Sequence, residues 1–64
     1  MKILILGGNG MLGPWVVDAL GDRHQLRITD IGEPPETTHE WRQIDVSSLD
    51  DVVDAAEGMD AIIN

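Results

Sequence analysis

The stretch KILILGGNGMLG, residues 2–13, decides the fold of this chain. After one lysine it is a continuous aliphatic run, which is typical of a strand that is buried on both faces in a parallel sheet. Glycines at positions 7, 8, 10 and 13 follow at once and limit the run to the length of a strand. We therefore expect a strand at 2–6 that leads directly into a glycine-rich loop.

A helical pattern follows the glycines. Apolar residues recur every four positions between Met11 and Leu20, which predicts a helix over that range. Pro14 suits the first turn, because the amide that it lacks would have no partner there. Gly21 is expected to end the helix. Trp15 is expected to pack against the protein, and the alternative is that it faces the rim of the glycine loop.

The remainder of the chain alternates between strand and helix patterns. We expect strands at 25–29, 41–46 and 60–64, with a proline-containing loop over 30–40. Strands that alternate with helices indicate parallel pairing. The fold class predicted is therefore α/β, a partial Rossmann-type parallel sheet of four strands in the order 3-2-1-4.

A second helix is predicted between the last two strands. Ser47 and Ser48 stand where an N-cap belongs, and the acidic residues of the first turn favour the helix dipole. Gly58 is a suitable C-terminal stop. The apolar face is expected to consist of Leu49, Val52, Val53 and Ala56.

The spacing of Gly7, Gly10 and Gly13 has a physical explanation if the loop holds a dinucleotide. The first glycine permits a turn out of the strand, the second lets a diphosphate lie against bare backbone, and the third lets the helix pack closely. The amides from Asn9 through Met11 and Leu12 would then point at the phosphates. Gly8 also begins a G-x-G-x-x-G match. The alternative is that the loop is only a tight turn.

Asp30 follows the second predicted strand, 20 positions after Gly10. An acidic residue at about that distance is expected to accept hydrogen bonds from the adenosine ribose, and it would repel a 2′-phosphate. This favours NAD over NADP, although Arg27 and Arg42 are basic residues that could approach a 2′-phosphate. The alternative is that Asp30 is a solvated turn residue.

Composition excludes several functions. The net charge is −8 and the four Lys and Arg residues are scattered, so we expect no binding to nucleic acid or to an anionic membrane. There is no cysteine, and His24 and His39 do not have a metal-ligand spacing, so no metal site is expected. No apolar run has the length of a membrane span. A cytoplasmic protein is the simplest interpretation.

The segment ILILGGNGMLG resembles the start of the NAD-dependent epimerase/dehydratase family, which belongs to the extended short-chain dehydrogenase/reductases. Gly7, Gly10 and Gly13 match its G-x-x-G-x-x-G pattern, and Asp30 matches its acidic residue. Asp45-Val46 matches a pair that contacts adenine in the family. The final DAIIN matches its fourth strand.

The resemblance implies that residues 1–64 are the N-terminal part of a single NAD(P)-binding Rossmann domain, truncated before the domain is complete. It implies NAD as cofactor, with NADP less favoured, and a parent oxidoreductase that acts on a nucleotide-sugar or similar small molecule. The remainder of the domain would be its partner, and a homodimer of the parent is left open.

The chain has no tyrosine and a single lysine, Lys2, so it lacks the family's catalytic Tyr-x-x-x-Lys pair. No catalytic residue is therefore assigned, and whether the protein is an enzyme stays open. Two alternatives remain. One is a non-catalytic NAD(P)-sensing or regulatory protein of the same fold, and the other is an acidic interaction module.

Overall fold

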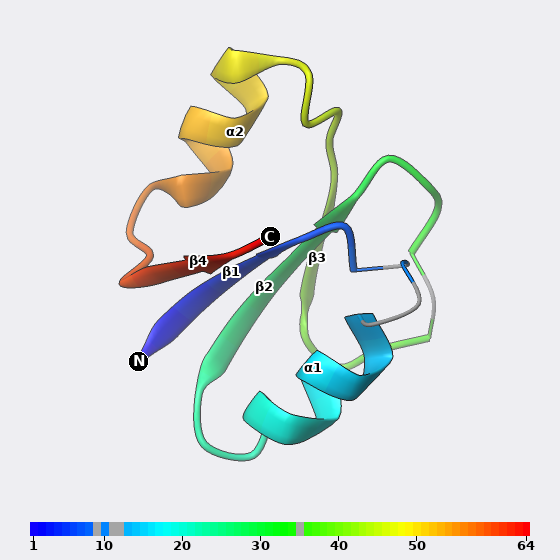
Figure 1. The fold of residues 1–64 in the computed structure, drawn as a ribbon, viewed down its shortest axis with the longest axis vertical. Coiled ribbons are helices and arrows are strands. Elements are labelled where there is room, and N and C mark those ends of the chain that lie inside the picture. Colours follow the sequence, from blue (N-terminus) through cyan, green and yellow to red (C-terminus); the bar gives the residue numbers. More distant parts are fainter. Residues whose placement is uncertain (9, 11–12, 35) are drawn as a thin grey trace.

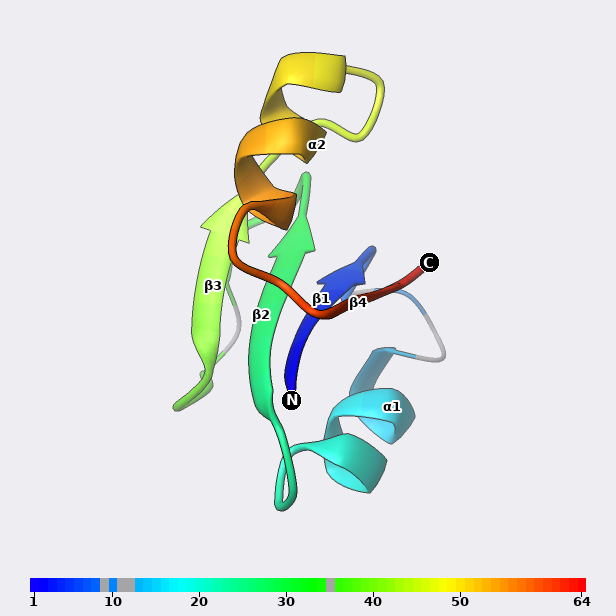
Figure 2. The ribbon, with the colours of Figure 1, turned by 90° about the vertical axis from the view of Figure 1, so that its left-hand side faces the viewer.

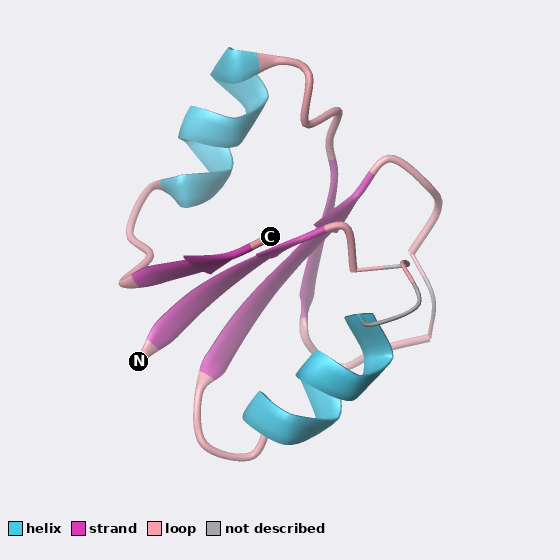
Figure 3. Cartoon of the chain, in the orientation of Figure 1, coloured by secondary structure: helices cyan, strands magenta, loops and turns pink. Residues whose placement is uncertain are grey.

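The computed structural model describes residues 1–8, 10, 13–34 and 36–64. Its helices and strands follow one another in the order β1 (Lys2–Leu6), α1 (Gly13–Leu20), β2 (Gln25–Asp30), β3 (Glu40–Gln43), α2 (Leu49–Ala56) and β4 (Ala61–Ile63) (Figures 1 and 3). The strands form one sheet in the order β3-β2-β1-β4, and each neighbouring pair is parallel. The predicted α/β class, the parallel pairing and the strand order are confirmed.

Strand β1 lies between β2 and β4 and carries the centre of the core. Ile5 of β1 is level with Ile28 of β2 and with Ile63 of β4. Ile3 and Ile5 pack with Leu26 and Ile28 on one face of the sheet. Leu4, which points to the other face, is fully buried. The aliphatic run is therefore buried on both faces, as its lack of alternation predicts.

The two described helices cover opposite faces of this sheet (Figures 1 and 2). Helix α1 packs Val16, Val17 and Leu20 against the isoleucine-rich face. Helix α2 lies on the other face, where the guanidinium of Arg27 reaches the carbonyl of Ala55. In the described part of the chain, neither helix is long and apolar enough to cross a bilayer.

The helix ends follow the local signals in the sequence. Pro14 occupies the first turn of α1, and the amide of Gly21 donates to the carbonyl of Val17 at its end. Ser48 is the N-cap of α2, and its hydroxyl accepts from the amide of Asp51. Gly58 follows α2 with a φ of 79°, a backbone conformation that favours glycine.

The prediction for β3 is wrong in its bounds. It ends at Gln43, so Asp45 and Val46 lie in the turn that leads to α2. The Asp45 carboxylate accepts hydrogen bonds from the amide and the hydroxyl of Ser47. This local turn satisfies the backbone in place of a strand partner and ends the ladder.

The prediction that three apolar side chains pack inside is also wrong. Trp15 is 74% exposed, Leu49 is 74% exposed and Val53 is 59% exposed. Helix α2 has one buried residue, Ala55, and its backbone carbonyl is bonded to Arg27 of β2. Periodicity identified an apolar face, but no described residue covers the outer part of it.

Candidate functional site

The parallel sheet brings three predicted binding segments to one edge. The glycine loop follows β1, Asp30 ends β2, and Asp45 comes just after β3. Leu6 is level with Thr29, and Asp30 is level with Gln43, so these strands end side by side. We call this the carboxyl edge of the sheet. In open α/β sheets, ligands bind in a crevice outside the carboxyl ends of the strands.

The glycine loop begins with a sharp turn that is fastened to β2. The amides of Gly7 and Gly8 both donate to the carbonyl of Thr29, at 2.9 Å each. Gly7 has a φ of 77°, which residues with a Cβ rarely adopt. Its hypothetical Cβ would meet no atom within 4 Å. Glycine is therefore required here by backbone conformation and not by space.

Gly8 and Gly13 are required by space. A Cβ on Gly8 would collide with the Cγ2 atom of Ile28, and a Cβ on Gly13 would collide with the backbone of Gly8. Helix α1 thus begins in direct contact with the backbone of the glycine loop. The steric role of Gly8 was missed in the sequence. The signal was available, because two consecutive glycines follow a buried strand.

Gly10 differs from the other three glycines. It is exposed, and it is not among the described glycines with positive φ. A Cβ on Gly10 would lie 3.2 Å from the backbone carbonyl oxygen of Gly7, a tight contact that requires this oxygen to shift by a few tenths of an ångström. Folding therefore requires glycine less strictly at position 10 than at positions 7, 8 and 13.

The amide of Gly10 does not behave as expected. It donates to the carbonyl of Gly7 at 3.0 Å, so it closes the turn instead of pointing outward. The other amides predicted to face phosphate belong to Asn9, Met11 and Leu12, which lie outside the described residues. Gly10 therefore contributes only bare backbone to this edge.

The carboxylate of Asp30 is held at the same edge. Its Oδ1 atom accepts from the amide of Gly32 at 3.0 Å, and its backbone carbonyl accepts from the amide of Ile44 at 2.9 Å. The side-chain amide of Gln43 donates to the carbonyl of Ile31. These bonds fix the start of the loop after β2 against the end of β3. Asp30 is half-buried beside the glycine loop.

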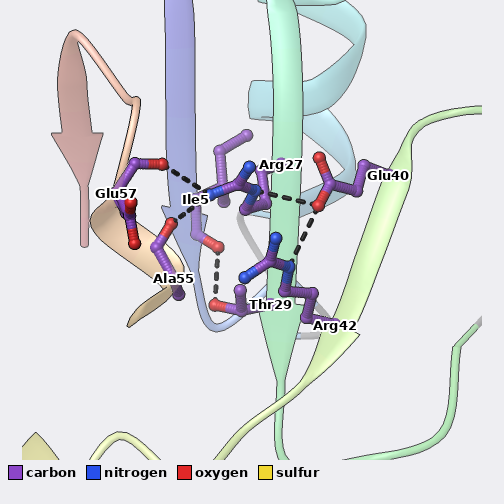
Figure 4. Close-up of polar contacts among 7 residues, drawn as sticks. All are labelled: Ile5, Arg27, Thr29, Glu40, Arg42, Ala55 and Glu57. Carbon is purple, nitrogen blue, oxygen red and sulfur yellow. Dashed lines mark hydrogen bonds and ion pairs between the residues drawn. The ribbon is translucent and has the colours of Figure 1, made fainter. Parts of the chain in front are cut away.

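Two arginines that could have received a 2′-phosphate are engaged in another network (Figure 4). The Nε atom of Arg27 donates to Glu40 at 2.9 Å, and its Nη1 atom donates to the carbonyls of Ala55 and Glu57. Arg27 therefore caps the carbonyl end of α2, where the helix dipole favours a cation. It is level with Leu4 and Glu40, away from the carboxyl edge.

Glu40 joins Arg27 to Arg42, whose Nε atom donates to the same carboxylate oxygen at 3.0 Å. Burial opposes ionisation of Glu40, but the hydrogen bonds and positive charges of the two arginines outweigh it. The pKa of the Glu40 carboxyl therefore lies below its ordinary value.

Asp45, expected from the resemblance to contact adenine, stabilises the turn before α2. Its carboxylate accepts from the hydroxyl of Ser47 at 2.7 Å and from the amide of Ser47 at 2.9 Å. These two bonds hold the pKa of Asp45 below its usual value. Val46 is 58% exposed next to it. Both residues thus lie at the carboxyl edge, where Asp45 already has a structural role.

Described residues line cavities on two sides of the fold, and Gly8 of the glycine loop lines one of them. One lies between α1 and the residues before β3, and the other lies at the opposite edge of the sheet.

Comparison with family models, with curated proteins and with solved structures found no match to this chain. The candidate site therefore depends on the chain's own residues and geometry.

Proposed function

We propose that this chain is the dinucleotide-binding part of a Rossmann-type protein, with NAD favoured over NADP. The parent would be an oxidoreductase similar to the NAD-dependent epimerases and dehydratases, and its substrate would be a nucleotide-sugar or another small molecule. NAD would supply hydride transfer when bound. The groups assigned to this chain bind and orient the cofactor.

The observation that carries the proposal is the contrast among the glycines of the loop. Gly7, Gly8 and Gly13 are each explained by backbone conformation or by steric contact within the fold. Gly10 is explained only weakly in this way, yet it is exposed at the end of the central strand. A bare backbone at that position is what the close approach of a diphosphate requires.

The carboxylate at the end of β2 supports the same function. Asp30 ends the strand next to β1, at the distance along the chain that is typical of ribose recognition. Arg27 and Arg42 are paired with Glu40, so the charge of each arginine is already partnered by a carboxylate and favours a 2′-phosphate less. The net charge of −8 does not oppose the proposal, because the loop would meet the phosphates with backbone groups and a helix N-terminus.

The absence of tyrosine limits the proposal to binding. No group in the chain is assigned to proton transfer. A non-catalytic NAD(P)-sensing protein of the same fold would use the carboxyl edge in the same way, so a binding experiment tests what the two alternatives share.

The test is a titration of the isotopically labelled chain with NAD and, separately, with NADP, followed by amide NMR shifts. We expect NAD to shift the amides of Gly7, Gly10, Ile31 and Ser47, and to leave the amide of Gln25 at the opposite edge unchanged. Gly10→Val should weaken NAD binding at least tenfold, because its side chain fills the space proposed for the diphosphate.

A matched control is Gly58→Asn. Gly58 has open space around its Cα and a positive φ that asparagine tolerates better than other residues, and it lies away from the carboxyl edge. This variant should bind NAD as the parent chain does. Unchanged NAD affinity in a folded Gly10→Val variant would remove the loop from the site.

A further inference from the structure

The amino edge of the sheet, where the strands begin, carries a cavity of about 400 Å³. Lys2 at the start of β1, His24 just before β2, and Thr38 and His39 just before β3 line it. This edge is opposite to the glycine loop. The volume is within the range of small-molecule sites, which runs from roughly 300 to 1,000 Å³.

Charge is unusually distributed around this cavity. The chain has 12 acidic residues and only six Lys, Arg and His residues. Four of these six line the cavity, namely Lys2, His24, Arg27 and His39, together with one acidic residue, Glu40. An acidic protein thus gathers most of its basic side chains at one place, which is the arrangement that attracts a small anion.

The acidic member of the group is already neutralised. The Glu40 carboxylate accepts hydrogen bonds from both Arg27 and Arg42. Arg27 also donates to the backbone carbonyls of Ala55 and Glu57 at the end of α2 (Figure 4). Among the described residues, the side chains of Lys2, His24 and His39 form no hydrogen bond or ion pair. Three donors therefore remain for a ligand.

His24 provides a second and independent observation. Its Nδ1 atom is buried and has no hydrogen-bond partner in the described structure. Buried polar atoms without partners are rare in folded proteins, and each is costly. Because His24 lines the cavity, a ligand oxygen there would supply the missing partner once the imidazole turns toward it.

The ligand is better described as an anion than as a metal. The described residues contain no group of three His, Cys, Asp or Glu side chains that could hold a metal ion. Lys2 offers only donors, and the Thr38 hydroxyl adds another possible donor. Ammonium and imidazole N–H groups form their strongest hydrogen bonds with anionic oxygens such as those of phosphate.

We propose that the amino edge of the sheet is a second binding site, for a phosphate group, with Lys2, His24 and His39 as its donors. Leu26 and Met59 also line the cavity and offer apolar contact to the remainder of a phosphomonoester. This site is separate from the carboxyl edge and does not depend on dinucleotide binding.

The test is an NMR titration of the labelled chain at constant ionic strength, with inorganic phosphate in one arm and phenyl phosphate in the other. We expect both probes to shift the amides of His24, Thr38 and His39 and to leave that of Gly10 unchanged. Tighter binding of phenyl phosphate would assign the site to phosphomonoesters, and equal binding would assign it to free phosphate.

Lys2→Gln should weaken phosphate binding about tenfold, the effect of losing one charge-assisted contact. His24→Leu should weaken it as much, and His24→Asn, whose amide nitrogen can replace Nδ1, should restore part of the affinity. The matched control is Arg23→Gln, which removes an equal charge from an exposed residue outside the cavity and should leave the affinity within about twofold.

Gly10→Val should bind phosphate normally, so the two proposed sites can fail separately. No shift at the amino edge with either probe would overturn the second site. Equal affinities for the Lys2→Gln, His24→Leu and parent chains would do the same, provided that circular dichroism shows all three folded.

Discussion

Replacing the loop glycines by alanine one at a time should separate folding from binding. In Gly13→Ala the new methyl group would collide with the backbone of Gly8, including its carbonyl carbon at 2.6 Å and its Cα at 3.1 Å. Backbone atoms cannot move aside as the end of a side chain can. In Gly10→Ala the nearest atom is the Gly7 carbonyl oxygen at 3.2 Å, which is also backbone but has to move by only a few tenths of an ångström.

The expected magnitudes follow from these distances. Overpacking of this kind costs about 1–3 kcal/mol, and more where the backbone must move. Replacing a helical glycine by alanine stabilises the fold by at most about 1 kcal/mol through helix propensity. We therefore expect Gly13→Ala to lose about 2 kcal/mol, out of a total stability of roughly 3–10 kcal/mol for a chain of this size. Gly10→Ala should change stability by no more than about 0.5 kcal/mol.

The assay is thermal and urea unfolding followed by far-ultraviolet circular dichroism, together with calorimetric titration of NAD. Each kcal/mol corresponds to a shift of about 4–8 °C in Tm for a domain of this size. Gly13→Ala should melt well below the parent chain, whereas Gly10→Ala should melt near it and bind NAD more weakly. If Gly10→Ala loses as much stability as Gly13→Ala, Gly10 is a folding requirement, and the reasoning that gives it to a ligand is refuted.

Three further outcomes are expected. Asp30→Asn keeps an acceptor for the loop amide but loses the charge, so it should lower the ratio of NAD to NADP affinity at least tenfold. Asp54→Asn on α2 is the control. An unchanged ratio in Asp30→Asn would mean that Asp30 is not at the ribose. Glu40 has a lowered pKa in the fold, so its stabilising effect is present at neutral pH and is lost as the pH falls through that lowered pKa. Glu40→Gln should cost less than about 1 kcal/mol at pH 7, and the difference from the parent should shrink in acid, as urea unfolding at several pH values will test. Arg27→Met should lower the free energy of unfolding in urea by about 2–3 kcal/mol, because the carbonyls of Ala55 and Glu57 lose a charged donor. Arg42→Met removes a single ion pair and should lower it by less than about 1 kcal/mol. Equal losses of stability would contradict the capping role of Arg27.

The arrangement of the strands was predictable because local signals and chain order agree. The aliphatic run at 2–6 had to be a buried strand, and Ser48 and Gly58 marked the ends of α2 before any contact was known. Once strands alternate with helices, the rules for parallel connections leave few topologies, and the order 3-2-1-4 is one of them. These elements depend on nearest neighbours in sequence, which is why sequence reasoning reached them.

Burial on the outside of α2 could not be predicted in the same way. A period of 3.6 residues shows that Leu49 and Val53 share a face, but it does not show what lies opposite that face. In the structure the small side chain of Ala55 is the buried one, and the larger side chains of Leu49 and Val53 stay exposed. Trp15 is similar, since its place on the first turn of α1 said nothing about its neighbours.

The basic residues at the amino edge were not recognised as a group in the sequence because they lie far apart along the chain. Lys2, His24 and His39 are separated by more than a dozen residues each, and none has a motif around it. Parallel pairing places the beginnings of β1, β2 and β3 at one edge, and so it assembles side chains that the sequence shows as scattered.

The two proposed sites would bind phosphate groups through different kinds of hydrogen-bond donor. A chain with a net charge of −8 repels anions at long range, so any phosphate must be met by short-range, oriented donors. At the carboxyl edge the proposed donors are backbone amides and a helix N-terminus, which need glycine and no positive side chain. At the amino edge no glycine loop exists among the described residues, and the scarce basic side chains gather there instead. It follows that a variant that removes basic side chains should affect only the amino edge, whereas a variant that adds a side chain to the loop should affect only the carboxyl edge. Two sites with such opposite sensitivities can be separated by mutation even if both bind phosphate.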